Sequence, residues 1–84
     1  MGKAMIVYKV YPEEEVNMDE LEERIKKIEK VTETKREPIA FGLELLKVAM
    51  VIDDKQEKPE VYENQLKETE GVKDIETDSM NLIS

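Results

Sequence analysis

The chain has 84 residues, enough for one small domain over residues 1–84 with a single core and little room for a deep pocket. It carries 21 acidic and 13 basic side chains, and its net charge of −8 argues against direct nucleic-acid binding and favours a basic protein partner. Because cysteine and histidine are both absent, disulfides, Cys/His zinc sites, thiolate nucleophiles and imidazole catalysis are excluded.

The first predicted element is a strand over residues 5–11, which are rich in β-branched and aromatic side chains and are followed by Pro12. Residues 12–15 contain three consecutive glutamates. Their spacing does not resemble that of a calcium-binding loop, so we expect a solvated acidic loop here.

A helix is predicted to begin at Asn17, whose side chain can cap it, with Glu20 three residues later to complete a capping box. Apolar residues then recur at helical spacing and should face the core: Met18, Leu21, Ile25 and Ile28. Acidic side chains precede basic ones by four residues in three pairs that we expect to form a solvated face: Glu20–Arg24, Glu22–Lys26 and Glu23–Lys27.

The segment 43–52 is the most apolar of the sequence and predicts a central strand with neighbours on both edges. Residues 31–37 have mixed β propensity and precede Pro38, which cannot donate to a strand ladder, so they predict an edge strand. A Pro-Ile-Ala-Phe-Gly turn over residues 38–42 connects the two.

The remaining residues predict a second helix and a fourth strand. After a polar loop over residues 53–58, Pro59 suits the first helical position and Gly71 the helix terminator. The inner face of this helix is a thin stripe: Val61, Tyr62, Leu66 and Thr69. Residues 72–80 predict the last strand, which leaves residues 81–84 as a short tail.

The resulting β-α-β-β-α-β order predicts an α+β fold of the ferredoxin-like type: a four-stranded antiparallel sheet with two helices packed on one face. The two most apolar strands, over residues 5–11 and 43–52, should lie side by side in the middle of the sheet. Because many unrelated functions share this fold, the topology alone does not define a function.

Few side chains offer chemistry of their own. Asp53 and Asp54 are candidates for magnesium ligation, but adjacent carboxylates usually need further oxygen ligands, so a solvated turn is the favoured interpretation. The strand over residues 43–52 has no aromatic ring on which a nucleic-acid base could stack. No segment approaches the roughly 18 apolar residues of a membrane span and no signal-peptide pattern opens the chain, so we expect a cytoplasmic protein. By elimination, a protein–protein module is favoured over an enzyme.

Phe41, the one phenylalanine of the sequence, lies in a turn that is almost wholly apolar, whereas strand-connecting turns are usually polar. Two interpretations are open. The ring folds back over the edge of the sheet, or it is presented at a turn bounded by Pro38 and Gly42 as an aromatic anchor for a partner.

Four stretches resemble archaeal elongation factor 1-beta, the counterpart of the C-terminal exchange domain of the eukaryotic factor: residues 38–43, the apolar strand running to Asp53-Asp54, Glu70-Gly71-Val72 and Thr77-Asp78. Length, acidity and element order agree across essentially the whole chain. The resemblance implies a guanine-nucleotide exchange factor for elongation factor 1-alpha, the GTPase that delivers aminoacyl-tRNA to the ribosome. Such a protein is not an enzyme in its own right and needs no cofactor.

The resemblance also implies which residues contact the GTPase: Pro38, Ile39, Ala40, Phe41, Gly42, Met80 and Asn81. Eukaryotic members end in a pattern with a lysine that is proposed to reach the magnesium site. Here Met80-Asn81-Leu82 follows part of that pattern without the lysine, and Lys73 is the last lysine of the chain. Exchange would then depend on another C-terminal residue such as Asn81, or on distortion of the GTPase switch region.

The alternative hypothesis is a ferredoxin-like module that binds another protein or a small ligand, or that pairs with itself through its sheet edges. A tight homodimer that forms no complex with the GTPase would favour this alternative. The exchange hypothesis expects a monomer when the protein is free.

Overall fold

The computed structural model describes residues 2–53 and 55–83. The strands and helices follow one another as β1 (Lys3–Pro12), α1 (Met18–Lys26), β2 (Val31–Pro38), β3 (Glu44–Asp53), α2 (Pro59–Glu68) and β4 (Val72–Leu82). A short 3-10 turn, Ala40–Gly42, links β2 to β3. The order of elements predicted from the sequence is confirmed.

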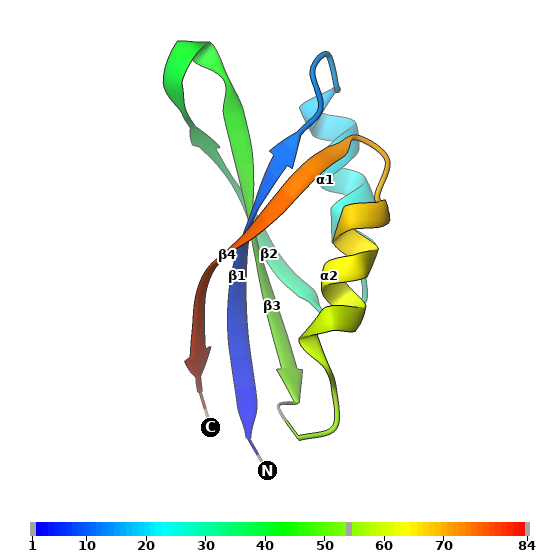
Figure 1. The fold of residues 1–84 in the computed structure, drawn as a ribbon, viewed down its shortest axis with the longest axis vertical. Coiled ribbons are helices and arrows are strands. Elements are labelled where there is room, and N and C mark those ends of the chain that lie inside the picture. Colours follow the sequence, from blue (N-terminus) through cyan, green and yellow to red (C-terminus); the bar gives the residue numbers. More distant parts are fainter. Residues whose placement is uncertain (1, 54, 84) are drawn as a thin grey trace.

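The four strands form one antiparallel sheet in the order β2-β3-β1-β4, so β3 lies beside β1 in the middle as predicted. Figure 1 shows both helices on the same side of the sheet. This arrangement is the ferredoxin-like α+β fold expected from the sequence.

The core lies between the helices and the covered face of the sheet. Alternate residues of β1 point into this core, and each is at most 2% exposed: Ala4, Ile6, Tyr8 and Val10. Strand β3 and helix α1 supply most of the remainder: Leu46, Val48, Met50, Ile52, Leu21 and Ile25. Met18 and Ile28 pack at the margin of the core, so the predicted apolar stripe of α1 is confirmed.

Helix α2 contributes less to the core. Leu66 is fully buried and Tyr62 packs against the core, but Val61 is half exposed. The expectation that Val61 faces inward is wrong, because consecutive helical residues are about 100° apart and Tyr62, Leu66 and Thr69 already define a narrow stripe.

The start of α1 is capped as predicted on one side only. The Asn17 side chain accepts a hydrogen bond from the Glu20 N–H at 3.2 Å. A complete capping box would also need the Glu20 carboxylate to accept a hydrogen bond from the Asn17 backbone N–H, and the described residues show no such bond. The Glu20 carboxylate lies instead 3.6 Å from the Arg24 guanidinium. The prediction of a complete capping box is therefore wrong, since the ion pair with Arg24 engages the carboxylate.

Gly71 has a different role from the predicted one. Helix α2 ends at Glu68, and Gly71 lies beyond its C-cap residue with φ +98°, in the left-handed region. Its carbonyl accepts a hydrogen bond from the Glu13 N–H at 2.8 Å, and a Cβ here would lie 2.7 Å from a Val16 methyl group. Glycine is required for the close approach of the start of β4 to the β1–α1 loop, rather than as a helix terminator.

Strand β4 continues to Leu82, beyond its predicted end. Asn81 pairs with Met5, and the Ile83 N–H donates to the Lys3 carbonyl at 2.8 Å. The prediction of a tail here is wrong because β1 begins two residues earlier than expected and offers further backbone partners.

Candidate functional site

The connection between β2 and β3, residues 38–43, forms a closed turn that we call the tip. The Ile39 N–H donates to the Leu43 carbonyl at 2.8 Å, and the Leu43 N–H donates to the Ala40 carbonyl at 3.4 Å. Pro38 ends β2 without a backbone donor, which stops the ladder at this point. The conformation of the tip is therefore set by its own short sequence.

Two consecutive residues of the tip have left-handed backbone. Phe41 has φ +64° and ψ +31°, and Gly42 has φ +72°. Glycine adopts this region readily, but a bulky side chain rarely does, and the strain is of order 1–3 kcal/mol. Strained residues of this kind cluster at functional sites, so Phe41 is a candidate for a role outside folding.

The Phe41 side chain is 97% exposed, so the interpretation in which it folds back over the sheet is wrong. Two further apolar side chains flank it, with Ile39 39% and Leu43 59% exposed. Together the three form an apolar surface at the tip. The apolar segment 43–52 predicted that Leu43 begins the central strand, but β3 begins at Glu44 and Leu43 belongs to the tip. The resemblance over residues 38–43, which groups Leu43 with the turn, was the sequence signal for this position.

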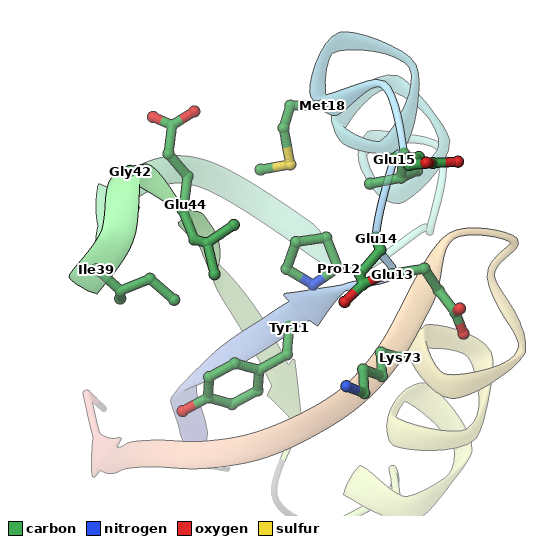
Figure 2. Close-up of a pocket in the computed structure, with 12 residues that line it drawn as sticks. Tyr11, Pro12, Glu13, Glu14, Glu15, Met18, Ile39, Gly42, Glu44 and Lys73 are labelled. Atoms are coloured by element: carbon green, nitrogen blue, oxygen red, sulfur yellow. The ribbon is translucent and has the colours of Figure 1, made fainter.

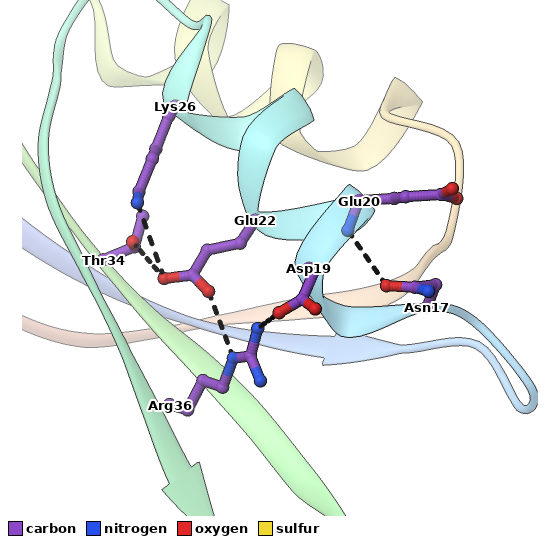
Figure 3. Close-up of polar contacts among 7 residues, drawn as sticks. All are labelled: Asn17, Asp19, Glu20, Glu22, Lys26, Thr34 and Arg36. Atoms are coloured by element: carbon purple, nitrogen blue, oxygen red, sulfur yellow. Dashed lines mark hydrogen bonds and ion pairs between the residues drawn. The ribbon is translucent and has the colours of Figure 1, made fainter.

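Strands β2 and β3 form a hairpin whose turn is the tip. Two polar side chains of β2 bind this hairpin to α1 (Figure 3). The Thr34 hydroxyl donates to one oxygen of Glu22 at 2.8 Å, and the Arg36 guanidinium donates to the other at 3.1 Å and to Asp19. The Thr34 hydrogen bond, followed by Arg36, holds the pKa of Glu22 below its ordinary value. Glu22 lies 3.9 Å from Lys26 as predicted, but it also joins helix to hairpin and so restrains the orientation of the tip.

The other predicted contact residues lie at the end of β4. Met80 is 55% exposed, and Asn81, Leu82 and Ile83 are also exposed. Strand β4 is an edge strand that pairs with β1 alone. This end is therefore held by a single ladder of backbone hydrogen bonds, and its outer edge is open.

The structure does not bring the two sets of predicted contact residues together. Figure 1 shows the tip and the end of β4 at opposite ends of the molecule, whose longest dimension is 42 Å. Among the residues that the structure describes, all large exposed apolar side chains except Val61 lie at these two ends. A partner that uses both ends must present two separate surfaces.

Asp78 stabilises the sheet between the two ends. Its carboxylate lies 3.7 Å from the Lys9 ammonium and 3.5 Å from that of Lys47. The charge of Asp78, followed by that of Glu37, raises the pKa of Lys47. These contacts connect β4 across β1 to β3 on the face that the helices leave uncovered.

The candidate magnesium site at the end of β3 is described only in part, because Asp54 lies outside the described residues. The Asp53 carboxylate accepts hydrogen bonds from the backbone N–H groups of Lys55 and Gln56, at 3.0 and 3.3 Å. It is thus engaged in the turn that follows the strand. Within residues 2–53 and 55–83, no cluster of three or more acidic side chains is arranged to hold a metal ion.

Neither helix described is long and apolar enough to cross a membrane.

Comparison with known proteins places this arrangement in a family. Residues 5–83 match the EF-1 guanine nucleotide exchange domain. Elongation factor 1-beta of Methanoculleus marisnigri is 36% identical over 84 residues, covering 99% of this chain and 100% of the relative. Elongation factor 1-beta of Hyperthermus butylicus is 38% identical over 90 residues, covering 100% of this chain and 98% of the relative. The chain belongs to the EF-1 guanine nucleotide exchange domain family.

Proposed function

We propose that this protein is a guanine-nucleotide exchange factor that promotes GDP release and GTP loading on the translation GTPase elongation factor 1-alpha. Membership of the exchange-domain family over residues 5–83 supports this assignment. The observation that carries it to particular residues is the strained and 97% exposed Phe41 at the tip.

Exchange requires differential affinity and no covalent chemistry. The exchange factor binds the nucleotide-free GTPase more tightly than the GDP-bound form, so its binding weakens that of GDP by the same factor. The protein forms no covalent intermediate, is not an enzyme in the classical sense, and needs no cofactor of its own.

The tip is the proposed anchor. Burying one exposed phenylalanine side chain in a partner contributes about 1.5–3 kcal/mol, the range expected of an interface hot spot. Pro38, Ala40 and Gly42 define the turn, while Ile39 adds apolar surface beside the ring. Because the backbone of the tip is already closed by its own hydrogen bonds, little ordering cost remains on binding.

The end of β4 supplies the second proposed contact, through Met80 and Asn81. Residues 74–84 contain no lysine, so the lysine of the eukaryotic pattern has no counterpart in β4 after Lys73. Exchange then depends on the amide of Asn81 or on displacement of the GTPase switch region by the end of the strand.

The remaining proposals follow from the assignment. Residues 1–84 act as one exchange domain, which is monomeric when free and works in the cytoplasm, where the GTPase delivers aminoacyl-tRNA. The net charge of −8 supports binding to a protein rather than directly to nucleic acid.

The release of fluorescently labelled GDP from elongation factor 1-alpha tests the function. Adding the protein should accelerate release, and truncation after Asp78 should reduce the acceleration because it removes the end of β4. Asn81→Ala provides a smaller change that leaves the ladder with β1 in place. Unchanged release at saturating wild-type protein would refute the proposal.

A further inference from the structure

A groove of about 370 Å³ lies between the tip and the β1–α1 loop, as Figure 2 shows. Ile39, Leu43 and Glu44 line it from the hairpin, and Glu14 and Met18 line it from the loop and the start of α1. The two walls are separated by about 25 residues of sequence and meet only in the fold. The groove therefore extends the apolar surface of the tip toward α1.

The groove combines apolar walls with an acidic rim. Met18 extends across the opening toward the tip, and Tyr11 lies at its base (Figure 2). Four lining residues are glutamates and one, Lys73, is basic, so the lining carries an excess of negative charge. In Figure 2 Glu14 lies beside Pro12 and Glu44 extends outward from the hairpin, whereas the side chains of Glu13 and Glu15 point away from the tip.

The walls of the groove are fixed by backbone contacts. The Glu13 N–H donates to the Gly71 carbonyl at 2.8 Å, which ties the loop to the start of β4. Glu15 has left-handed backbone with φ +64°, and Val16 packs against the core. The opposite wall is the closed turn between Ile39 and Leu43. A groove formed in advance loses little conformational entropy when it is filled.

The carboxylates of Glu14 and Glu44 are both available to an external cation. Within the described part of the chain, neither Glu14 nor Glu44 takes part in a side-chain hydrogen bond or an ion pair. Glu22, in contrast, is engaged by Thr34 and Arg36. A basic side chain that enters the groove can pack its methylene stem on the apolar walls and place its charge at the acidic rim.

We propose that the groove receives a basic segment of elongation factor 1-alpha, in which a lysine or arginine adjoins an apolar side chain. This inference rests on the proposed function, because it names the part of the partner that binds beside Phe41. Continuity with the tip favours this occupant, since Ile39 and Leu43 both flank the ring and line the groove. The charge of the groove is complementary to such a segment.

The test compares two double variants with the same change in net charge. Glu14→Gln/Glu44→Gln neutralises the groove, and Glu29→Gln/Glu60→Gln neutralises two exposed glutamates on the α1–β2 turn and the first turn of α2. Affinity for nucleotide-free elongation factor 1-alpha is measured by calorimetry at 50 and 200 mM salt. The groove variant should bind about three- to ten-fold more weakly at low salt, with a shallower salt dependence, because exposed ion pairs are individually weak and screened.

The control variant separates a local effect from a general one. If both variants lose the same affinity for the GTPase, only net charge matters. If the groove variant keeps wild-type affinity, the groove is empty in the complex. Each result overturns the proposal. Sedimentation velocity of the free protein tests a third outcome. If the wild type is a dimer and Glu14→Gln/Glu44→Gln dissociates it, the groove binds a second copy of this chain, and the proposal is overturned. If wild-type protein neither binds the GTPase nor accelerates GDP release, the proposed function itself fails, and that result is distinct from the others.

Discussion

The two ends of the molecule expose apolar side chains for different physical reasons. At the tip, a turn closed by its own hydrogen bonds holds Phe41 in a left-handed conformation and directs it into solvent. At the end of β4, Met80 and Leu82 are exposed on an edge strand that pairs with β1 alone. The tip is thus a rigid local structure, whereas the end of β4 depends on pairing with a distant strand.

The difference suggests a division of work between the ends. A fixed aromatic side chain suits anchoring, because its position costs little further ordering. A strand end held on one side suits a contact that adjusts to the state of the GTPase.

Phe41→Ala should have the largest effect on binding. Losing the burial of this ring should cost about 2 kcal/mol, or roughly 30-fold in affinity for the GTPase, measured by calorimetry. Thermal unfolding should be nearly unchanged, because the side chain is 97% exposed in the free protein. Val61→Ala, which truncates the exposed apolar residue away from both ends, is the matched control, and an equal loss of affinity in both variants would contradict the anchor role.

Gly42→Ala tests whether the shape of the tip matters as well as its ring. No atom lies within 4 Å of the Cβ that alanine would add, so the cost is confined to the backbone at φ +72° and should be about 1–2 kcal/mol. Chemical denaturation should show this loss of stability, or the tip should relax and lose affinity for the GTPase. A variant with wild-type stability and wild-type affinity would show that the left-handed turn is dispensable.

Met80→Ala should weaken binding less than Phe41→Ala, by about 1 kcal/mol or five-fold, because Met80 is already partly covered. Since the two ends are far apart, the effects of Phe41→Ala and Met80→Ala should add to within about 0.5 kcal/mol. A large non-additive term in this double-mutant cycle would mean that the ends do not act as separate contacts.

Glu22→Gln should have the smallest effect and should depend on pH. Because hydrogen bonds from Thr34 and Arg36 lower the pKa of Glu22 in the folded protein, its contribution is fully present above the ordinary value of 4.5 and is lost as the pH falls through the lowered value. The variant should therefore be less stable by about 1 kcal/mol or less at pH 7, and the difference should shrink below pH 4.5. Urea denaturation at several pH values measures it, and a difference that grows toward low pH would contradict the assignment.

Local signals in the sequence predicted the elements well. Asn17 caps α1, Pro38 ends β2, and Pro59 opens α2, each for a reason that depends on its own residue type. The errors arose where tertiary partners decide the outcome. The end of β4 is set by the length of β1, and Gly71 is required by Val16, which comes from a remote loop.

The candidate site was predictable only in part. The apolar turn around Phe41 was visible in the sequence, but its exposure was not, because the same residues could have folded back onto the sheet. The groove beside it could not have been predicted, since Glu14 and Glu44 belong to different elements and only the sheet topology brings them to the same end.

The affinity of this protein for elongation factor 1-alpha, measured with the GTPase in its nucleotide-free and GDP-bound forms, is decisive for the exchange mechanism. Binding to the nucleotide-free form should be tighter, by the same factor by which the protein weakens GDP binding. Phe41→Ala should weaken binding to the nucleotide-free form. Equal affinity for the two forms, or full affinity without the Phe41 ring, would contradict the proposed mechanism.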